Sequence, residues 1–126
     1  MVPQFVMNVP TSELRRVELR KCGPGISESL QIVAWEQKAD APGLVIDTMD
    51  FTVVQAVMSG RVFVIETTGG SRDRVYVIVY TAEGPKLALE RVTKARAEIT
   101  SDGKSIRLNV PDTRTGKTET FSFPCE

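Results

Sequence analysis

Residues 61–80 read RVFVIETTGGSRDRVYVIVY and decide the fold of this 126-residue chain. Two runs rich in valine, isoleucine and aromatic residues flank a Gly-Gly break, which is the pattern of two strands joined by a hairpin loop. Both runs are apolar on both faces, since Val62 and Val64 alternate with Phe63 and Ile65 in the first. A strand with one wet face would alternate apolar with polar residues, so this hairpin needs cover on both sides. The cover is expected to be the N-terminal segment, another subunit or a ligand inside a barrel.

The same pattern of apolar runs and glycine-bearing breaks continues on both sides of this hairpin. Short apolar runs recur about every ten residues between glycine-bearing breaks, which is typical of an all-β sandwich or barrel. Strands are expected over residues 28–37, 43–48, 51–58, 61–68, 74–81, 86–92, 95–101, 104–110 and 118–123. We favour a further strand over residues 11–22, although a short helix also fits. The sequence therefore predicts a single all-β domain over residues 1–126, an antiparallel β-sandwich or flattened β-barrel of successive hairpins, with residues 1–12 as an extended or disordered arm.

The glycine-bearing turns also predict which residues face each other. If Asp102-Gly103 forms a two-residue turn, Ile99 faces Ile106 on a buried side and Glu98 faces Arg107 on a wet side. The other pairs expected are Val57–Val62 and Val54–Ile65 around Ser59-Gly60, and Val110–Phe121 and Leu108–Phe123 in the last hairpin. The buried face is expected to hold Ile99, Ile106, Leu108, Phe121 and Phe123, and the wet face Arg96, Glu98, Arg107, Asn109 and Ser122. In residues 51–58, the alternation groups Phe51, Val53 and Val57 against Val54, Ala56 and Met58.

Composition and charge exclude several classes of function. Sixteen basic and sixteen acidic residues give a formal net charge of zero, so no field attracts nucleic acid or an anionic membrane. No window approaches the ~20 apolar residues of a membrane span. Residues 1–10 lack the apolar core of a signal peptide. The expected compartment is cytoplasmic if Met1 is the natural start, and periplasmic or secreted if a leader preceded it.

Cys22 and Cys125 are the two cysteines of the chain. A bridge between them would close a loop of about 100 residues and contribute up to about 4–5 kcal/mol in the chain-entropy model. An even cysteine count is compatible with this disulfide, and two reduced thiols are the alternative. Because no Cys-x-x-Cys spacing occurs, a redox pair or a zinc knuckle is not expected.

Two loops carry residues that bind ions or phosphate in other settings. Residues 47–50, together with Asp40, could ligate calcium or act as an acid/base pair, but the spacing of an EF-hand is absent. Residues 67–74 hold two glycines and two arginines, which could cradle a phosphate. This second loop leads into a strand and lacks the P-loop lysine, so it does not match that motif. Ordinary turn and hairpin residues are therefore the favoured interpretation of both loops.

The absence of histidine restricts catalysis. Ser-His-Asp and Cys-His arrangements cannot form, and the commonest metal ligand is missing. A pair of carboxylates, as in glycosidases, leaves little trace in sequence because its spacing is spatial. Glu66, Asp73 and Glu90 are the acidic residues near the central strands. They are the candidates for a carboxylate-based hydrolase.

Large side chains on the central strands are the candidates for a ligand cavity or an interface. They are Trp35, Phe63, Tyr76, Ile78 and Tyr80. Core packing is the default role of such residues. Lining a cavity or a protein contact is the alternative.

These observations favour a non-catalytic binding or interaction module, whose partner is another protein or a second copy in a homodimer. One alternative is a carrier holding an apolar small molecule inside a β-barrel, and another is a carboxylate-based hydrolase. We expect no cofactor, no metal, no nucleic-acid partner and no membrane insertion.

Overall fold

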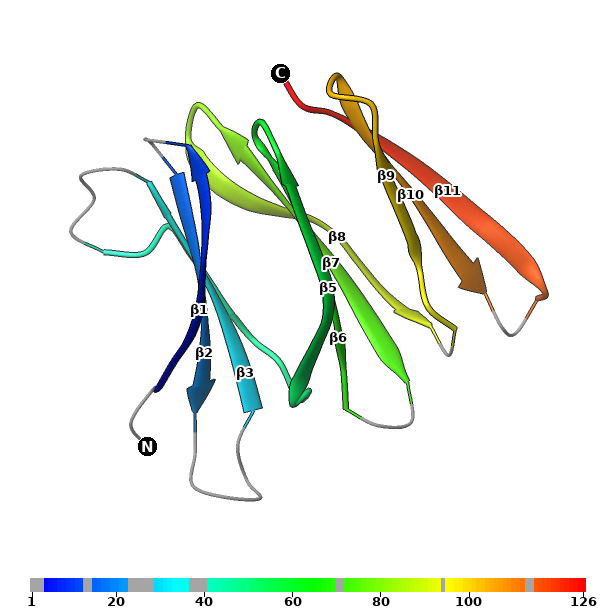
Figure 1. Cartoon of the computed structure of the whole chain (residues 1–126), viewed down its shortest axis with the longest axis horizontal. Helices are drawn as coiled ribbons and strands as arrows, with labels where there is room; N and C mark the ends of the chain where they lie inside the picture. The colour runs from blue at the N-terminus through cyan, green and yellow to red at the C-terminus, as the bar shows by residue number, and fades with distance from the viewer. Residues whose placement is uncertain are drawn as a thin grey trace.

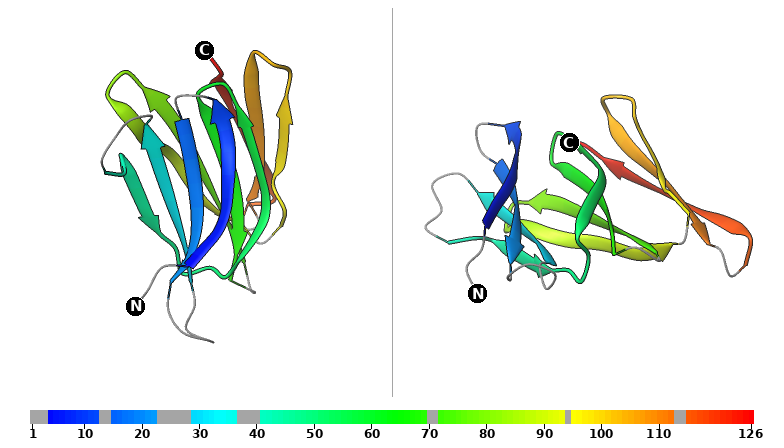
Figure 2. Two further views of the ribbon diagram at one scale, coloured as in Figure 1. Left: turned by 60° about the vertical axis from the view of Figure 1, so that its left-hand side comes forward. Right: turned by 60° about the horizontal axis from the view of Figure 1, so that its bottom comes forward.

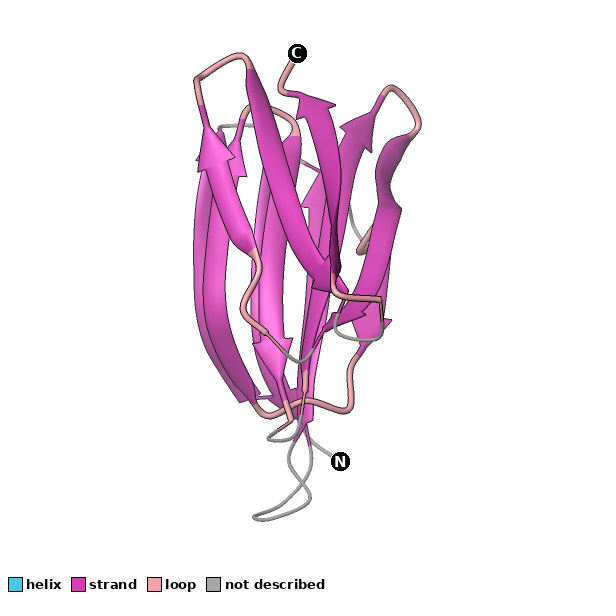
Figure 3. Cartoon of the chain, turned by 90° about the vertical axis from the view of Figure 1, so that its right-hand side faces the viewer, coloured by secondary structure: helices cyan, strands magenta, loops and turns pink. Residues whose placement is uncertain are grey.

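A computed structural model gives the fold of residues 4–12, 15–22, 29–36, 41–69, 72–93, 95–112 and 115–126, with only the backbone described for residues 4–12, 15 and 22. These ranges hold eleven strands and no helix, so the all-β class is confirmed (Figure 3). Within the same ranges, no helix has the length and apolar character that crossing a bilayer requires.

The strands form three antiparallel sheets (Figure 1). The first sheet has the order β1-β2-β3-β4, the middle sheet β5-β6-β7-β8 and the third sheet β11-β10-β9. Their bounds are β1 Gln4–Ser12, β2 Arg15–Cys22, β3 Ser29–Glu36, β4 Leu44–Asp47, β5 Thr52–Ser59, β6 Val62–Thr68, β7 Asp73–Thr81, β8 Gly84–Thr93, β9 Glu98–Ser101, β10 Ser105–Asp112 and β11 Lys117–Pro124. The segment expected as an arm contributes β1, which pairs with β2.

The middle sheet lies between the other two, as the views in Figures 1 and 2 show. One of its faces packs on the first sheet and the other on the third sheet, which gives two separate hydrophobic cores. The need for cover on both faces of residues 61–80 is thereby met within the chain. The N-terminal strands supply one cover, and the C-terminal hairpins supply the other.

The first interface, between the first and middle sheets, is rich in aromatic and large aliphatic side chains. Its fully buried members are Val17, Leu19, Ile32, Ala34, Phe63, Ile65, Tyr76, Ile78 and Tyr80. The second interface, between the middle and third sheets, is lined on the middle sheet by valines. Its buried members are Val62, Val64, Val75, Val77, Ala97, Ile106, Leu108, Val110 and Cys125. The alternation predicted for residues 61–80 is therefore confirmed.

The predicted hairpin registers are each wrong by two residues. Ser59 faces Val62, Ser101 faces Ile106 and Leu108 faces Phe121. In the first two turns, the glycine occupies the first loop position instead of the second, and Gly60 and Gly103 have φ values of 56° and 87°. Primed hairpin turns require a positive φ at that first position. A slide of two residues keeps every side chain on its face, so the predicted buried and wet faces remain correct.

Strand β5 departs from simple alternation. A register shift between Val53 and Gln55 marks a β-bulge. The bulge adds one residue and reverses the faces that follow it. Val53 therefore packs with Ala56 and Met58 in the first interface, and Val57 packs in the second. The predicted grouping of Val53 with Val57 is wrong for this reason.

The bridge between Cys22 and Cys125, one of the two alternatives left open by the sequence, does not form, because Cys125 is a free thiol. Cys125 is buried in the second interface, and its Sγ donates a hydrogen bond to Ser59 Oγ at 3.3 Å. Cys22 ends β2 in the first sheet, and its side chain lies outside the described part. The middle sheet separates the layers to which the two residues belong (Figure 1).

Candidate functional site

Two carboxyl groups meet at one end of the second interface. Glu66 on β6 faces Val75 on β7, and Asp73 lies two residues before Val75 on the same face of the sheet. Glu66 is fully buried, whereas Asp73 is partly exposed. Glu66 Oε1 accepts hydrogen bonds from Gln55 Nε2 at 2.6 Å and from the backbone N–H of Ala97 at 3.1 Å. Gln55 Nε2 also donates to the carbonyl of Ala97 at 2.7 Å.

This environment raises the pKa of Glu66 to about 7. Burial is the largest cause, because removal from water penalises the charged carboxylate. The neighbouring carboxyl group of Asp73 raises the pKa further, while the hydrogen bonds from Gln55 and Ala97 lower it. Glu66 Oε2 is buried and has no hydrogen-bond partner among the described residues.

Glu66 is closed to substrate. A general acid must come within hydrogen-bond reach of the atom that it protonates. Glu66 has no exposed surface, and Ala97 and Gln55 already bind its other oxygen. No group of three or more metal-ligating side chains occurs in the described ranges either. The pair can therefore store a proton within the fold, where Glu66 is out of reach of solvent.

Four of the five large side chains singled out from the sequence come together in the first interface. Phe63, Tyr76, Ile78 and Tyr80 are each no more than 1% exposed. Burial also raises the pKa of Tyr76. Tyr80 Oη lies 3.0 Å from the carbonyl of Arg16 and 3.1 Å from that of Trp35, which fixes β7 to the first sheet. Core packing accounts for these four positions.

Trp35 lies apart from them, on the outward face of the first sheet. Ile32 and Ala34 of the same strand point into the core, so Trp35 and Val33 point the other way. The guanidinium carbon of Arg16, the cross-strand neighbour, lies 4.9 Å from the centre of the indole ring. This distance is typical of a cation–π contact.

In the two loops considered for binding ions or phosphate, charged side chains form contacts within the fold. Asp47 accepts a hydrogen bond from Gln31 Nε2 at 2.8 Å, while Asp50 accepts one from Thr67 Oγ1 at 2.6 Å. The two aspartates therefore point to different partners, and Asp40 lies outside the described residues. The same holds for Gly70 and Ser71 of the second loop. Arg74 of this second loop forms an ion pair with Glu90 at 3.4 Å. Glu90, one of the three hydrolase candidates, is therefore already paired.

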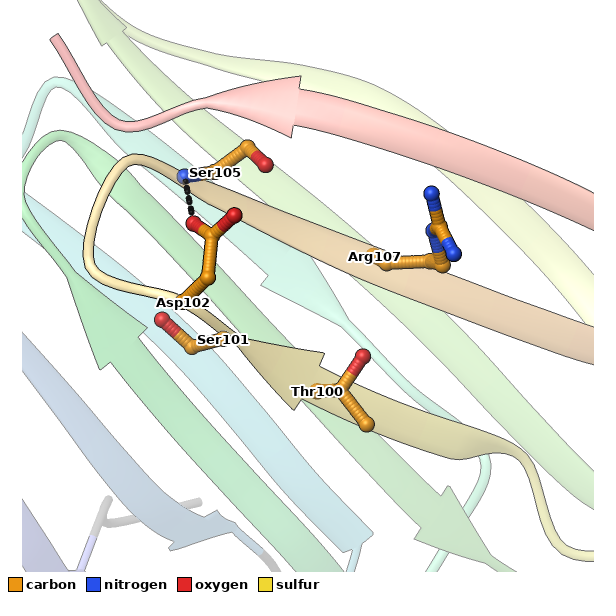
Figure 4. A pocket seen from close by; sticks show the side chains of 5 residues that line it. All are labelled: Thr100, Ser101, Asp102, Ser105 and Arg107. Carbon is orange, nitrogen blue, oxygen red and sulfur yellow. Dashed lines mark hydrogen bonds between the residues drawn. The ribbon is translucent and has the colours of Figure 1, made fainter.

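A polar depression of about 240 Å³ lies on the hairpin of β9 and β10, on the outward face of the third sheet. Its lining residues are Thr100, Ser101, Asp102, Ser105 and Arg107 (Figure 4). Thr100 and Arg107 face each other across the two strands. The turn closes one end, where Asp102 Oδ1 accepts hydrogen bonds from the N–H groups of Lys104 and Ser105, each at 2.8 Å. Both hydrogen bonds lower the pKa of Asp102, and the bond from Ser105 has the larger effect.

Sequence reasoning missed this depression because it assigned Arg107 to Glu98. In the observed register, Glu98 faces Asn109 and accepts a hydrogen bond from its Nδ2 at 3.0 Å. Asn109 Oδ1 in turn accepts from Thr120 Oγ1 at 2.9 Å. The guanidinium of Arg107 is left without an ion pair or hydrogen bond to any described residue. A correct turn assignment at Gly103 would have revealed the unpaired arginine.

The comparisons with known proteins add no relative to this geometry. No family model, curated protein or solved structure matches the chain.

Proposed function

We propose that this protein is a non-catalytic binding module that contacts a partner protein through the outward face of its third sheet. The observation that carries the proposal is the unpaired guanidinium of Arg107 beside the hydroxyl groups of Thr100, Ser101 and Ser105. Neighbouring side chains on the same face are already held, since Thr120, Asn109 and Glu98 form a hydrogen-bonded row. A polar face on which Arg107 makes no ion pair or hydrogen bond to a described residue is suited to docking.

The dimensions of the depression favour a side chain over a free small molecule. Small-molecule sites usually enclose about 300–1,000 Å³, and this depression is smaller and open to solvent. A carboxylate from an aspartate or glutamate of the partner could accept two parallel hydrogen bonds from Arg107. The hydroxyl groups of Thr100 and Ser105 are further donors. Arginine is also among the residues that most often anchor protein interfaces.

The other hypotheses receive less support. The homodimer and the apolar-ligand carrier were motivated by the two apolar faces of the middle sheet, and the chain's own sheets cover both. The hydrolase would require Glu66 to reach a substrate, and Glu66 is fully buried. The outward face of the third sheet, by contrast, carries a polar depression that is open to solvent.

Panning a displayed random-peptide library on the immobilised protein tests the proposal. The enriched peptides should contain aspartate or glutamate, and their affinity should fall about tenfold or more in Arg107→Ala, because hydrogen bonds to charged groups contribute about 1.5–3 kcal/mol. Arg72→Ala is the matched control, since Arg72 is an exposed arginine on the connection between β6 and β7. It should leave binding unchanged. Peptides that bind wild type and Arg107→Ala equally would refute the proposal.

A further inference from the structure

The end of the second interface contains an imbalance of hydrogen-bond donors and acceptors. An ionised carboxylate only accepts hydrogen bonds. Glu66 Oε2 is buried without a donor, and the neighbouring side chain is another carboxyl group, Asp73. If both groups were ionised, two acceptors of like charge would meet in a dry interface. A proton on Oε2 converts the same contact into a hydrogen bond.

We propose that Glu66 carries a proton shared with Asp73 in the folded protein near neutral pH, and that its loss loosens the third sheet from the middle sheet. The proton belongs on Glu66 because Glu66 is fully buried while Asp73 is partly exposed. This inference is independent of the proposed binding role.

The charged groups around Glu66 do not offer a substitute for the proton. From β5 the neighbour is the neutral Gln55, and from the connection that precedes β9 it is the backbone of Ala97. On β8, Arg91 lies in the same cross-strand row, but its Nε pairs with Glu119 at 3.5 Å and its guanidinium lies 5.3 Å from the ring of Phe121. On β7, Arg74 has the opposite face and pairs with Glu90. Asp73 is thus the charged group that acts most directly on Glu66.

Glu66 is placed where its charge affects the joint between the sheets. It binds the N–H of Ala97, and Gln55 binds the carbonyl of the same residue. Ala97 is the last residue before β9, so these bonds hold the entry to the third sheet. A new buried negative charge at this point would repel Asp73 and draw water into the interface.

Urea unfolding of the full chain at pH 5.5, 6.5 and 7.5, at constant ionic strength, tests the inference. The chain has no histidine, so no other side chain has an ordinary pKa within this range. We expect the folding equilibrium constant of wild type to fall by up to about tenfold per pH unit as pH rises towards neutrality. Hydrogen exchange should accelerate first at Ala97 and in β9 to β11.

Glu66→Gln mimics the protonated acid, since its amide can donate to Asp73, and it should abolish the dependence on pH. Asp73→Asn removes the like charge and should reduce the dependence, which provides a second test if the first variant folds poorly. Glu90→Gln is the control, because Glu90 lies on the opposite face, and it should keep the wild-type slope. A flat wild-type profile, or a Glu66→Gln profile as steep as that of wild type, would overturn the proposal.

Discussion

The two interfaces of the middle sheet are both lined by buried apolar side chains, yet they treat buried polar groups differently. In the first interface donors meet acceptors, since the Tyr80 hydroxyl reaches two backbone carbonyls and Thr67 donates to Asp50. In the second interface an acid meets an acid, and Glu66 Oε2 has no donor within the described chain. The comparison teaches that the first interface is held by packing and by matched hydrogen bonds. The second interface also depends on a proton.

The largest effect is expected in the first interface. Phe63→Ala removes a fully buried aromatic ring and should lower the free energy of unfolding by about 4 kcal/mol, through lost burial and the cavity left behind. The loss should be the same at pH 5.5 and pH 7.5, because Phe63 packs in the first interface, on the opposite face of β6 from Glu66. Chemical unfolding monitored by Trp35 fluorescence measures it. Met49→Ala, at a side chain that is 79% exposed, should change stability by less than about 0.5 kcal/mol.

The next effect is the dependence of stability on pH in the second interface. The pKa of Glu66 is raised from 4.5 to about 7 in the folded chain, so the stabilising proton is fully present below 4.5 and is lost as pH rises through 7. One proton over this interval corresponds to about 3 kcal/mol. Phe63→Ala should retain this dependence unchanged, which would separate the two interfaces in one pair of titrations. Equal pH profiles for wild type and Glu66→Gln would contradict the claim that the second interface depends on a proton on Glu66.

A smaller effect is expected where the C-terminus closes the second interface. Gly60 has a φ of 56°, and a Cβ there would lie 2.2 Å from the carbonyl oxygen of Cys125. Gly60→Ala should therefore cost about 2–3 kcal/mol, from backbone strain and displacement of Cys125. Gly116→Ala is the matched control, because Gly116 has a φ of 71° and open space around its Cα. Thermal unfolding of both variants should show the larger loss for Gly60→Ala, and equal losses would contradict a role for Cys125 in closing the interface.

The smallest effect is expected at the rim of the same interface. Arg91 and Glu119 are about two-fifths exposed, and their atoms are 3.5 Å apart. Exposed ion pairs contribute about 0–1 kcal/mol, so Arg91→Ala should lower stability by less than 1 kcal/mol. Urea unfolding at low and high salt would measure it. A loss above 2 kcal/mol would mean that rim charges, and not Glu66, dominate the electrostatics of the second interface.

Sequence reasoning succeeded where the two-residue alternation of side chains along a strand determines the structure. The nine strands expected between residues 28 and 123 all form, because glycine-bearing breaks and two-residue alternation mark strands directly. The faces of β6, β7, β10 and β11 are correct for the same reason. The registers are wrong by two residues because a slide of two preserves every face, so the hydrophobic pattern cannot detect it. Only the position of glycine within each turn distinguishes the two registers.

The candidate site was harder to predict than the fold. Glu66 and Asp73 were recognised as acidic residues near the central strands, but their burial follows from how the third sheet packs, which no local pattern encodes. The role of Arg107 was lost with the register of one hairpin. Trp35 and the four core residues all have large side chains, but they do not share an environment. The sequence does not reveal which face of the first sheet points outward.

A direct titration of the Glu66 carboxyl group tests the difference between the two interfaces most sharply. Carbon NMR of the side-chain carboxyl resonances, with Glu66 assigned by comparison with Glu66→Gln, gives the pKa in the folded protein. We predict a midpoint near pH 7 that coincides with faster hydrogen exchange at Ala97. A midpoint near 4.5 would show that Glu66 is ionised throughout the neutral range and would contradict the proton-dependent joint.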